Sequence, residues 1–390
     1  MNKMQSTCLT FVVPLCLLLT GCPQPSDIET GRIESPEAFY EQVTVPERLY
    51  IDVDFERMST LTSVKQYTGE TMDMDQEKLV KAFFKDRSVE KSSWADGVTY
   101  AAKDGDITEY LNVDDGGESF GTPTDAKGGF YYIKMIGNDD PNRWGQVACQ
   151  DFKFQNVAQN EINSDYRSKT DLGFLPYDQT VNAIFDVLHK ADLPDLVIDE
   201  TYSLDLATMT DHYQKFLKDR LDRGGLNAAV EPEEWTTEDE CYLFSLQQLV
   251  GELPVVNKGW MKPEGATTFD YTMPATGVKL TYDQNGIRYI NEYNLLRIVS
   301  EGEPVELISG YDALKALVDE YANIIIEQDI HIVTAQLCYL LYPVSEDQFS
   351  FALKPGWIFS SRAVIGDLNL TEYRIDVVDA VTGDLHPGRF

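Results

Sequence analysis

The sequence predicts an α+β protein with two lobes of antiparallel sheet and helices packed on one face of each sheet. Three observations lead to this prediction. Several short segments alternate apolar and polar residues with the period of a β-strand. Two pairs of such segments are joined by Asp-Gly or Asn-Gly, which favour hairpin turns. Longer segments place apolar residues three and four positions apart, as amphipathic helices do.

The first lobe is expected to span residues 47–165. Residues 49–55 alternate as a strand does, and Asp75 is placed to open a helix that carries Leu79 and Phe83. A hairpin is expected over 98–111, because Asp104-Gly105 tolerates the positive φ of a tight turn. Residues 130–136 are predicted to be a further strand.

The second lobe is expected to span residues 166–390. Its first helix places Val181, Ile184, Phe185 and Leu188 on one face. A strand over 196–206 and a helix over 210–223 follow, the helix ended by Gly224-Gly225. Strands are predicted at 242–244 and 254–256, with an acidic loop between them and that helix.

The last part of the chain has the clearest pattern. A hairpin is predicted from 278–282 and 287–290, with Asn285-Gly286 in the turn. Ser309 and Asp312 have the spacing of a capping box ahead of a helix. Strands at 330–342, 351–360 and 373–378 then complete an antiparallel sheet, and Gly383 suits a tight turn after them.

This helix, these strands and the closing segment Ile375-Asp376-Val377-Val378-Asp379-Ala380-Val381-Thr382-Gly383-Asp384 resemble a PepSY-type unit. Pro355-Gly356-Trp357 resembles the Pro-x-Trp strand start of the YycH/YycI class of regulators from low-GC Gram-positive bacteria. The resemblance covers residues 270–390. The helices beginning at Tyr177 and Tyr311 resemble the two copies of a repeat in that class. The resemblance implies a binding or inhibitory module that brings no catalytic residue with it.

The start of the chain predicts export and lipid attachment. Residues 1–21 combine Lys3 with a short apolar run, and an eleven-residue helix would span only about 16 Å, too little for a membrane. Leu19-Thr20-Gly21-Cys22 resembles the lipobox of bacterial lipoproteins, which implies a lipidated Cys22. Residues 22–46, rich in Pro and Ser, are predicted to be a flexible tether. We therefore expect an extracytoplasmic protein anchored to the bacterial cell membrane through Cys22.

The net charge of the protein limits the classes of partner that it can bind. The 390 residues include 32 Lys and Arg against 65 Asp and Glu, a formal charge of −33. Nucleic acid is excluded as a partner on this ground, because binding it requires cations that neutralise phosphates. The same balance argues against adhesion to anionic lipid through a basic patch. Three cysteines remain after the signal and Cys22, namely Cys149, Cys241 and Cys338, so one disulfide at most can form within the chain.

No catalytic residue and no cofactor are predicted. None of the four histidines lies in an HExxH motif, and neither a P-loop nor a GxGxxG motif is present. A carboxylate pair cannot be selected from so many acids. Asp114, Asp115 and Glu118 are weak candidates for a calcium site, although they do not have the spacing of an EF-hand loop.

Aromatic residues give the candidate contacts. Trp260, Trp357 and Tyr289 are predicted to touch a ligand or partner, since flat rings provide a large contact area, and packing within the sheets is the alternative. The function predicted first is a non-enzymatic binding or regulatory protein that holds a protein, a peptide or a cell-wall component. A secreted hydrolase with a glycosidase-like carboxylate pair is the alternative. A solute-binding protein has less support, because no βαβ alternation is evident.

Overall fold

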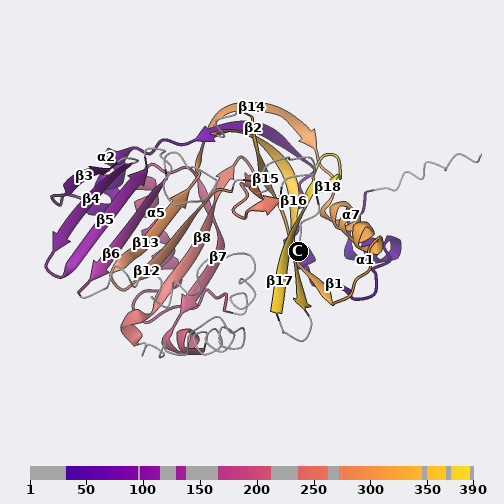
Figure 1. Cartoon of the computed structure of the whole chain (residues 1–390), viewed down its shortest axis with the longest axis horizontal. Coiled ribbons are helices and arrows are strands. Elements are labelled where there is room, and N and C mark those ends of the chain that lie inside the picture. The colour runs from indigo at the N-terminus through magenta and orange to yellow at the C-terminus, as the bar shows by residue number, and fades with distance from the viewer. Residues whose placement is uncertain are drawn as a thin grey trace, which may run out of the picture. The chain divides into compact units, whose positions relative to one another are not determined.

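Two largely antiparallel sheets form the fold of this computed structural model (Figure 1). The structure describes residues 32–94, 97–114, 129–137, 166–211, 236–261, 272–273, 275–344, 349–365 and 370–386. From Ile33 onward the chain belongs to one compact unit. The protein is of the mixed α+β class, as the sequence predicts.

The larger sheet has nine strands within the described residues. Its order is β3 (Glu90–Trp94), β4 (Gly97–Asp104), β5 (Ile107–Asp114), β6 (Phe130–Ile136), β13 (Gly286–Tyr293), β12 (Gly277–Asp283), β8 (Cys241–Val250) and β7 (Leu196–Leu204), with β9 (Leu253–Pro254) paired to β8. Both predicted hairpins are confirmed. Gly105 and Gly286 take positive φ values of 59° and 91° in their turns, a conformation that glycine adopts at little cost.

Helices α2 (Gln76–Phe84) and α5 (Tyr177–Lys190) pack on one face of this sheet. Asp75 caps α2 by accepting hydrogen bonds from the backbone N–H groups of Glu77 and Lys78, as predicted. The helices bury Leu79, Phe84, Ile184 and Leu188 against strand residues on this face, which include Tyr100, Leu111, Tyr132, Phe244, Leu246, Leu280 and Ile290. Burial of this apolar surface holds the helices to the sheet.

The smaller sheet has seven strands within the described residues. They are β1 (Leu49–Ile51), β2 (Ser63–Thr71), β14 (Leu296–Glu306), β15 (Ile330–Pro343), β16 (Ser350–Ile365), β17 (Leu370–Asp379) and β18 (Leu385–His386). Strand β1 runs parallel to β15, and the other pairs are antiparallel. Helix α7 (Gly310–Ala322) contacts β15, β16 and β17. Its Ser309/Asp312 capping box is confirmed in both directions.

The remaining described elements are short. They are α1 (Pro36–Gln42), the 3₁₀ turns η1 (Phe55–Arg57) and η4 (Thr237–Asp239), and the pair β10 (Trp260–Met261) and β11 (Thr272–Met273). Residues 206–211 are helical, so the helix predicted over 210–223 begins earlier than expected, at residue 206. Its part after residue 211 lies outside the described residues. No helix in the described ranges is long and apolar enough to cross a membrane.

The sheets do not follow the predicted boundary between residues 165 and 166. Strand β2 comes from the predicted first lobe, yet it pairs with β14 and β16 in the smaller sheet. Strands β12 and β13 lie within the predicted 270–390 region, yet they pair with β8 and β6 in the larger sheet. Each lobe is therefore assembled from both halves of the chain. Strand pairing between distant segments decides this, and local patterns do not report it.

The predicted tether over 22–46 is wrong for its second half. Ile33 and Phe39 are buried in the core of the smaller sheet, and residues 36–42 form α1. Ser35 accepts a hydrogen bond from the N–H of Ala38, and Pro36 occupies the start of the helix. Ser-Pro at these two positions is a helix-start signal in its own right. The segment is therefore part of the folded body from Ile33 onward.

Glu292 lies where the chain leaves the larger sheet for the smaller one. Its carboxylate accepts hydrogen bonds from the backbone N–H groups of Leu295, at 2.9 Å, and Phe130, at 3.2 Å. Burial raises the pKa of Glu292 to about 8, in spite of these two hydrogen bonds. The folded protein therefore holds a proton on Glu292 at pH values where the unfolded chain has released it.

We expect this proton to make stability depend on pH. Between the unfolded pKa of 4.5 and the folded value of about 8, the folded state binds more protons, so the free energy of unfolding falls as the pH rises. The slope due to Glu292 is at most about 1.4 kcal/mol per pH unit. Glu292→Gln cannot ionise and should lose this slope. Urea unfolding from pH 5 to 9 tests it, with Glu303→Gln at an exposed site as the control. Parallel curves for all three proteins would contradict the assignment.

Candidate binding site on the nine-stranded sheet

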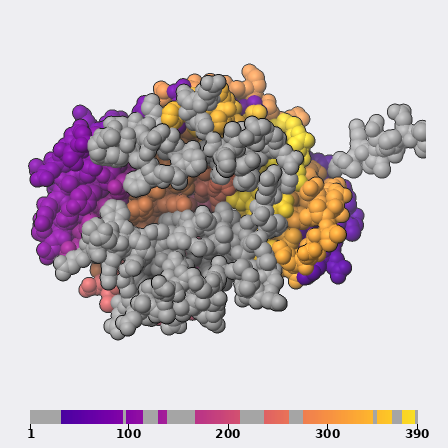
Figure 2. Space-filling model, in the orientation of Figure 1, coloured from indigo at the N-terminus to yellow at the C-terminus, as the bar shows by residue number. Residues whose placement is uncertain are grey.

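The face of the larger sheet opposite α2 and α5 carries polar and aromatic side chains. Successive residues of a strand point to opposite faces, so the neighbours of the buried core residues lie on this side. We call it the polar face and define it by two rows of laterally paired residues. Figure 2 shows the brown-orange and red surface of this sheet at the centre of the view, between grey atoms.

The first row crosses seven neighbouring strands and contains six polar residues and one tyrosine. In order from β4 to β7, its members are Thr99, Asn112, Tyr131, Asn291, Lys279, Ser245 and Glu200. At about 4.8 Å between strands, the row is roughly 29 Å long. The second row lies next to it and contains Tyr110, Ile133, Tyr289, Thr281, Leu243 and Tyr202. Register alone places these residues side by side. Seven of the thirteen are at least partly exposed, and six are buried: Asn112, Ser245, Ile133, Thr281, Leu243 and Tyr202.

A β-bulge in β7 brings two carboxylates to the end of the first row. The register of β7 against β8 shifts between Ile198 and Glu200. Glu200 accepts hydrogen bonds from Arg167, at 2.6 Å, and from the Tyr202 hydroxyl, at 3.0 Å. Asp199 accepts one from Asn257, at 2.8 Å. Burial raises the pKa of Asp199, while Lys258 acts in the opposite direction.

Two side chains in the middle of the face are also affected by burial. The pKa of Lys279 falls to about 8, because burial outweighs the attraction of Glu200, and its Nζ lies 5.6 Å from the centre of the Tyr293 ring. Burial raises the pKa of Tyr289 to about 12, with a further contribution from Tyr131. Tyr289 thus stays a neutral phenol in the physiological range, able to donate and accept a hydrogen bond.

This arrangement suits binding better than proton transfer. The partly buried rings of Tyr110, Tyr131 and Tyr289 offer flat apolar contact, and the partly buried amide of Asn291 can donate and accept hydrogen bonds. The two carboxylates at the bulge already accept hydrogen bonds from protein groups. The face therefore offers shape and hydrogen bonding to a ligand.

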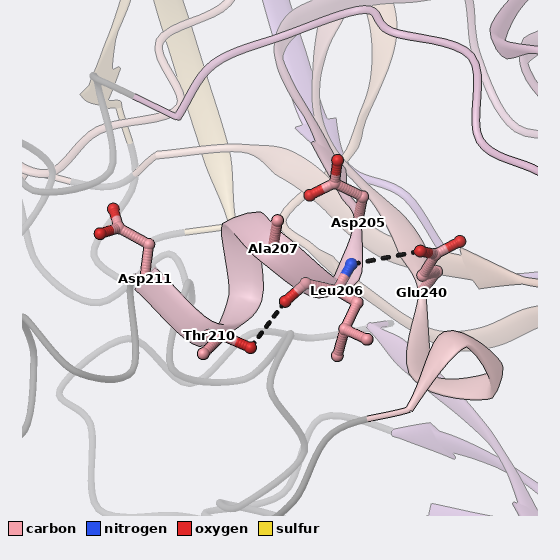
Figure 3. A pocket seen from close by; sticks show the side chains of 6 residues that line it. All are labelled: Asp205, Leu206, Ala207, Thr210, Asp211 and Glu240. Atoms are coloured by element: carbon pink, nitrogen blue, oxygen red, sulfur yellow. Dashed lines mark hydrogen bonds between the residues drawn. The ribbon is translucent and has the colours of Figure 1, made fainter.

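A hollow that carries three acidic residues lies at the end of β7 (Figure 3). It is lined by Asp205, Leu206, Ala207, Thr210, Asp211 and Glu240. Its carboxylates serve local structure. Glu240 accepts the N–H of Leu206, Asp205 accepts that of Thr208, and Asp211 accepts the Tyr166 hydroxyl. Each of the three carboxylates thus accepts a hydrogen bond from a neighbouring protein group.

Two of the three predicted aromatic contacts are wrong. Trp260 is 1% exposed and Trp357 is fully buried, and both belong to the core of the smaller sheet. The packing alternative therefore holds for them, because burying an indole stabilises the sheet more than exposing it would. Tyr289 does lie on the polar face, partly buried.

The other predicted residues fall at or beyond the edge of the described chain. Asp114 ends β5, while Asp115 and Glu118 lie outside the described residues. Within those residues, no three His, Cys, Asp or Glu side chains are grouped as a metal site would need. Cys22 and Cys149 also lie outside the described part. Cys241 and Cys338 are buried free thiols.

Most residues of the polar face were not predicted as contact residues from the sequence. Lys279 and Asn291 occupy alternate positions between core residues, a signal that marks them as facing away from the core. What no local pattern reveals is that they lie side by side.

The sequence also holds Gly117-Glu118-Ser119-Phe120-Gly121, which has the spacing of a nucleophile elbow and lies outside the described residues.

Comparison with known proteins adds information on the fold alone. No protein-family model matches the chain, and no curated protein matches it. A crystal structure of an uncharacterized protein from Eubacterium rectale is similar, with a TM-score of 0.57 and 18% sequence identity. The match covers 89% of this chain and 92% of that one. Nearly the whole fold is therefore shared with a known structure.

Proposed function

We propose that this protein is a lipid-anchored, extracytoplasmic binding or regulatory protein without catalytic activity, and that the polar face is where it holds its ligand. The observation that carries the proposal is the first row of the polar face. Its residues come from strands that are far apart in the sequence, yet register sets them side by side. Tyrosines and amides together are typical of recognition surfaces.

The carboxylates support binding over hydrolysis. In a glycosidase, one acid must protonate the leaving group while a second carboxylate attacks or activates water. Asp199 and Glu200 are instead engaged by Asn257, Arg167 and Tyr202. These contacts hold the acids in place as structural acceptors at the bulge.

We also propose that α7 and the strands after it form a PepSY-like unit of the kind found in YycH/YycI regulators. The order of one helix followed by antiparallel strands supports this. So does the closing turn, where Asp379 Oδ1 accepts the N–H groups of Val381 and Thr382 and Gly383 has a φ of 80°. The resemblance would make the protein a module that binds or restrains another component at the membrane.

Cys22 is the basis of the proposed location. The folded body begins at Ile33, about ten residues after Cys22 in the sequence, and residues 22–31 of the predicted tether lie outside the described residues. Acyl chains on Cys22 contribute about 0.8 kcal/mol per buried CH₂, enough with two or three chains for stable anchoring.

Replacing Cys22 with serine is expected to release the protein from the membrane. In a bacterial host, the wild-type chain should sediment with membranes, and mass spectrometry of its N-terminal peptide should find diacylglycerol on Cys22. Cys22→Ser removes the thiol that forms the thioether, so no lipid can attach. Cys16→Ser, within the apolar run, is the matched control and should still sediment. An unmodified Cys22 thiol in the mature protein would refute the location.

A further inference from the structure

The chemistry of the polar face is specific enough to indicate a class of ligand. In the first row, Tyr131 lies between two asparagines, Asn112 and Asn291. In the second row, Tyr110 and Tyr289 lie on either side of Ile133. Asn112 is buried and accepts a hydrogen bond from the Thr99 hydroxyl, at 2.6 Å, so the partly exposed amide beside the tyrosines is that of Asn291. Flat apolar surface thus lies next to an amide that can donate and accept hydrogen bonds. A ligand that fits must itself combine apolar faces with many hydrogen-bonding groups.

The strands in the middle of this face already pair on both sides. Strands β5, β6, β13, β12 and β8 each have a paired strand on both sides. An extended peptide binds a sheet by adding to an open edge, where backbone N–H and C=O groups are free. Between β5 and β8 the described residues offer no such edge, so side chains must recognise a ligand there; among the described strands that carry the face, only β7, which holds Glu200, lies at an end of the sheet. This argues against a peptide bound as an added strand.

Each charged group on the face lies near a group of opposite charge. Glu200 pairs with Arg167 at 2.6 Å and also attracts Lys279. Asp199 is held by Asn257 and lies within the electrostatic influence of Lys258. Among the described residues, the face thus presents neither a cationic nor an anionic surplus for a charged ligand.

We infer that the polar face binds a neutral oligosaccharide. Sugar rings present C–H faces that stack on tyrosine, and their hydroxyl groups match the Asn291 amide and the Lys279 ammonium group. The inference rests on the proposed function and names the ligand of the same site. The partly exposed middle of the first row, Tyr131, Asn291 and Lys279, crosses three strands or roughly 10 Å, so a short oligosaccharide can contact all three side chains.

The test uses the mature chain with Cys22→Ser, which removes the thiol to which lipid would attach. Calorimetric titrations with chitotetraose, cellotetraose and mannotetraose provide the neutral probes, and tetragalacturonic acid provides the acidic one. A library of unmodified peptides forms the second arm. We expect at least one neutral oligosaccharide to bind.

Two variants connect that binding to the face. Tyr289→Ala and Asn291→Ala should each raise the Kd for the bound sugar at least tenfold, by removing a stacking surface and an amide respectively. Tyr40→Ala is the matched control, because Tyr40 is 52% exposed on α1, outside the polar face. Circular dichroism and urea midpoints establish that each variant is folded. Asn291→Ala keeps the test decisive if Tyr289→Ala fails to fold.

The outcomes separate the inference from the proposed function. If no neutral sugar binds, or if binding survives both face variants, the inference is overturned. If only peptides bind and Tyr289→Ala abolishes that binding, the ligand class is wrong while the binding role of the face stands. If a neutral sugar binds and new reducing ends are released, the ligand class holds and the non-catalytic role is overturned.

Discussion

Replacing Asp376 with alanine is expected to lower the free energy of unfolding by about 3–5 kcal/mol. Asp376 is fully buried on β17, and its Oδ1 accepts a hydrogen bond from Arg374 Nε at 2.6 Å. Arg374 is itself only 8% exposed, and its guanidinium group lies 5.1 Å from the centre of the Tyr321 ring of α7. Removing the carboxylate leaves a buried cation without this partner, which costs more than the pair contributes.

Two further variants make this prediction specific. Asp319→Ala breaks the pair between Lys315 and Asp319, both on α7, where Asp319 is 56% exposed, and should cost no more than about 0.5 kcal/mol. Arg374→Leu combined with Asp376→Leu removes both charges and should regain most of the stability lost in Asp376→Ala. Urea unfolding of the four proteins measures these differences. Equal effects for Asp376→Ala and Asp319→Ala would show that burial does not strengthen the pair.

The elements predicted correctly are those fixed by neighbours in the sequence. Asp75 and Ser309 cap α2 and α7 because a side-chain oxygen reaches the N–H groups two or three residues ahead. Asn285-Gly286 turns the chain between β12 and β13 because Gly286 can take a positive φ. These contacts involve a few residues each, so the sequence contains all the information they need.

The polar face is the opposite case. Asn112, Tyr131, Asn291 and Lys279 come from four strands, and only the pairing of β5, β6, β13 and β12 makes them neighbours. A shift of one residue in any pairing would send a side chain to the helix-covered face. Hydrophobic alternation predicts on which side each residue lies, but not which residue lies beside it. The same reason explains why the division into lobes failed.

The tryptophans differ from the prediction for another reason. Trp357 lies in the strand predicted over 351–360, but alternation along a strand does not tell which face is covered by the core and which meets a ligand. Gly356 lies beside it in β16, where an added Cβ would come within 2.7 Å of Leu340 Cγ on the paired strand β15. The glycine leaves room for the side chains of the two strands to pack closely.

Truncating the Trp357 side chain should therefore lower the free energy of unfolding, and this effect should not depend on a ligand. Its ring lies under the start of α7, where a Cβ added to Gly310 would be 2.7 Å from Trp357 Cη2. Trp357→Ala leaves a large cavity in this core and should cost about 3–5 kcal/mol. Trp357→Phe should cost less, because it keeps a ring and the indole Nε1 has no hydrogen-bond partner among the described residues.

Tyr40→Ala serves again as the control, because an exposed ring contributes little to the core. Urea unfolding gives the stability of each variant, and titration with the sugar bound by the wild-type chain gives its affinity. We expect Trp357→Phe to bind that sugar as the wild type does, because Trp357 lies in the smaller sheet and the polar face belongs to the larger one. A variant that kept its stability and lost its ligand would restore Trp357 as a contact residue, since a core residue acts on binding only through the fold.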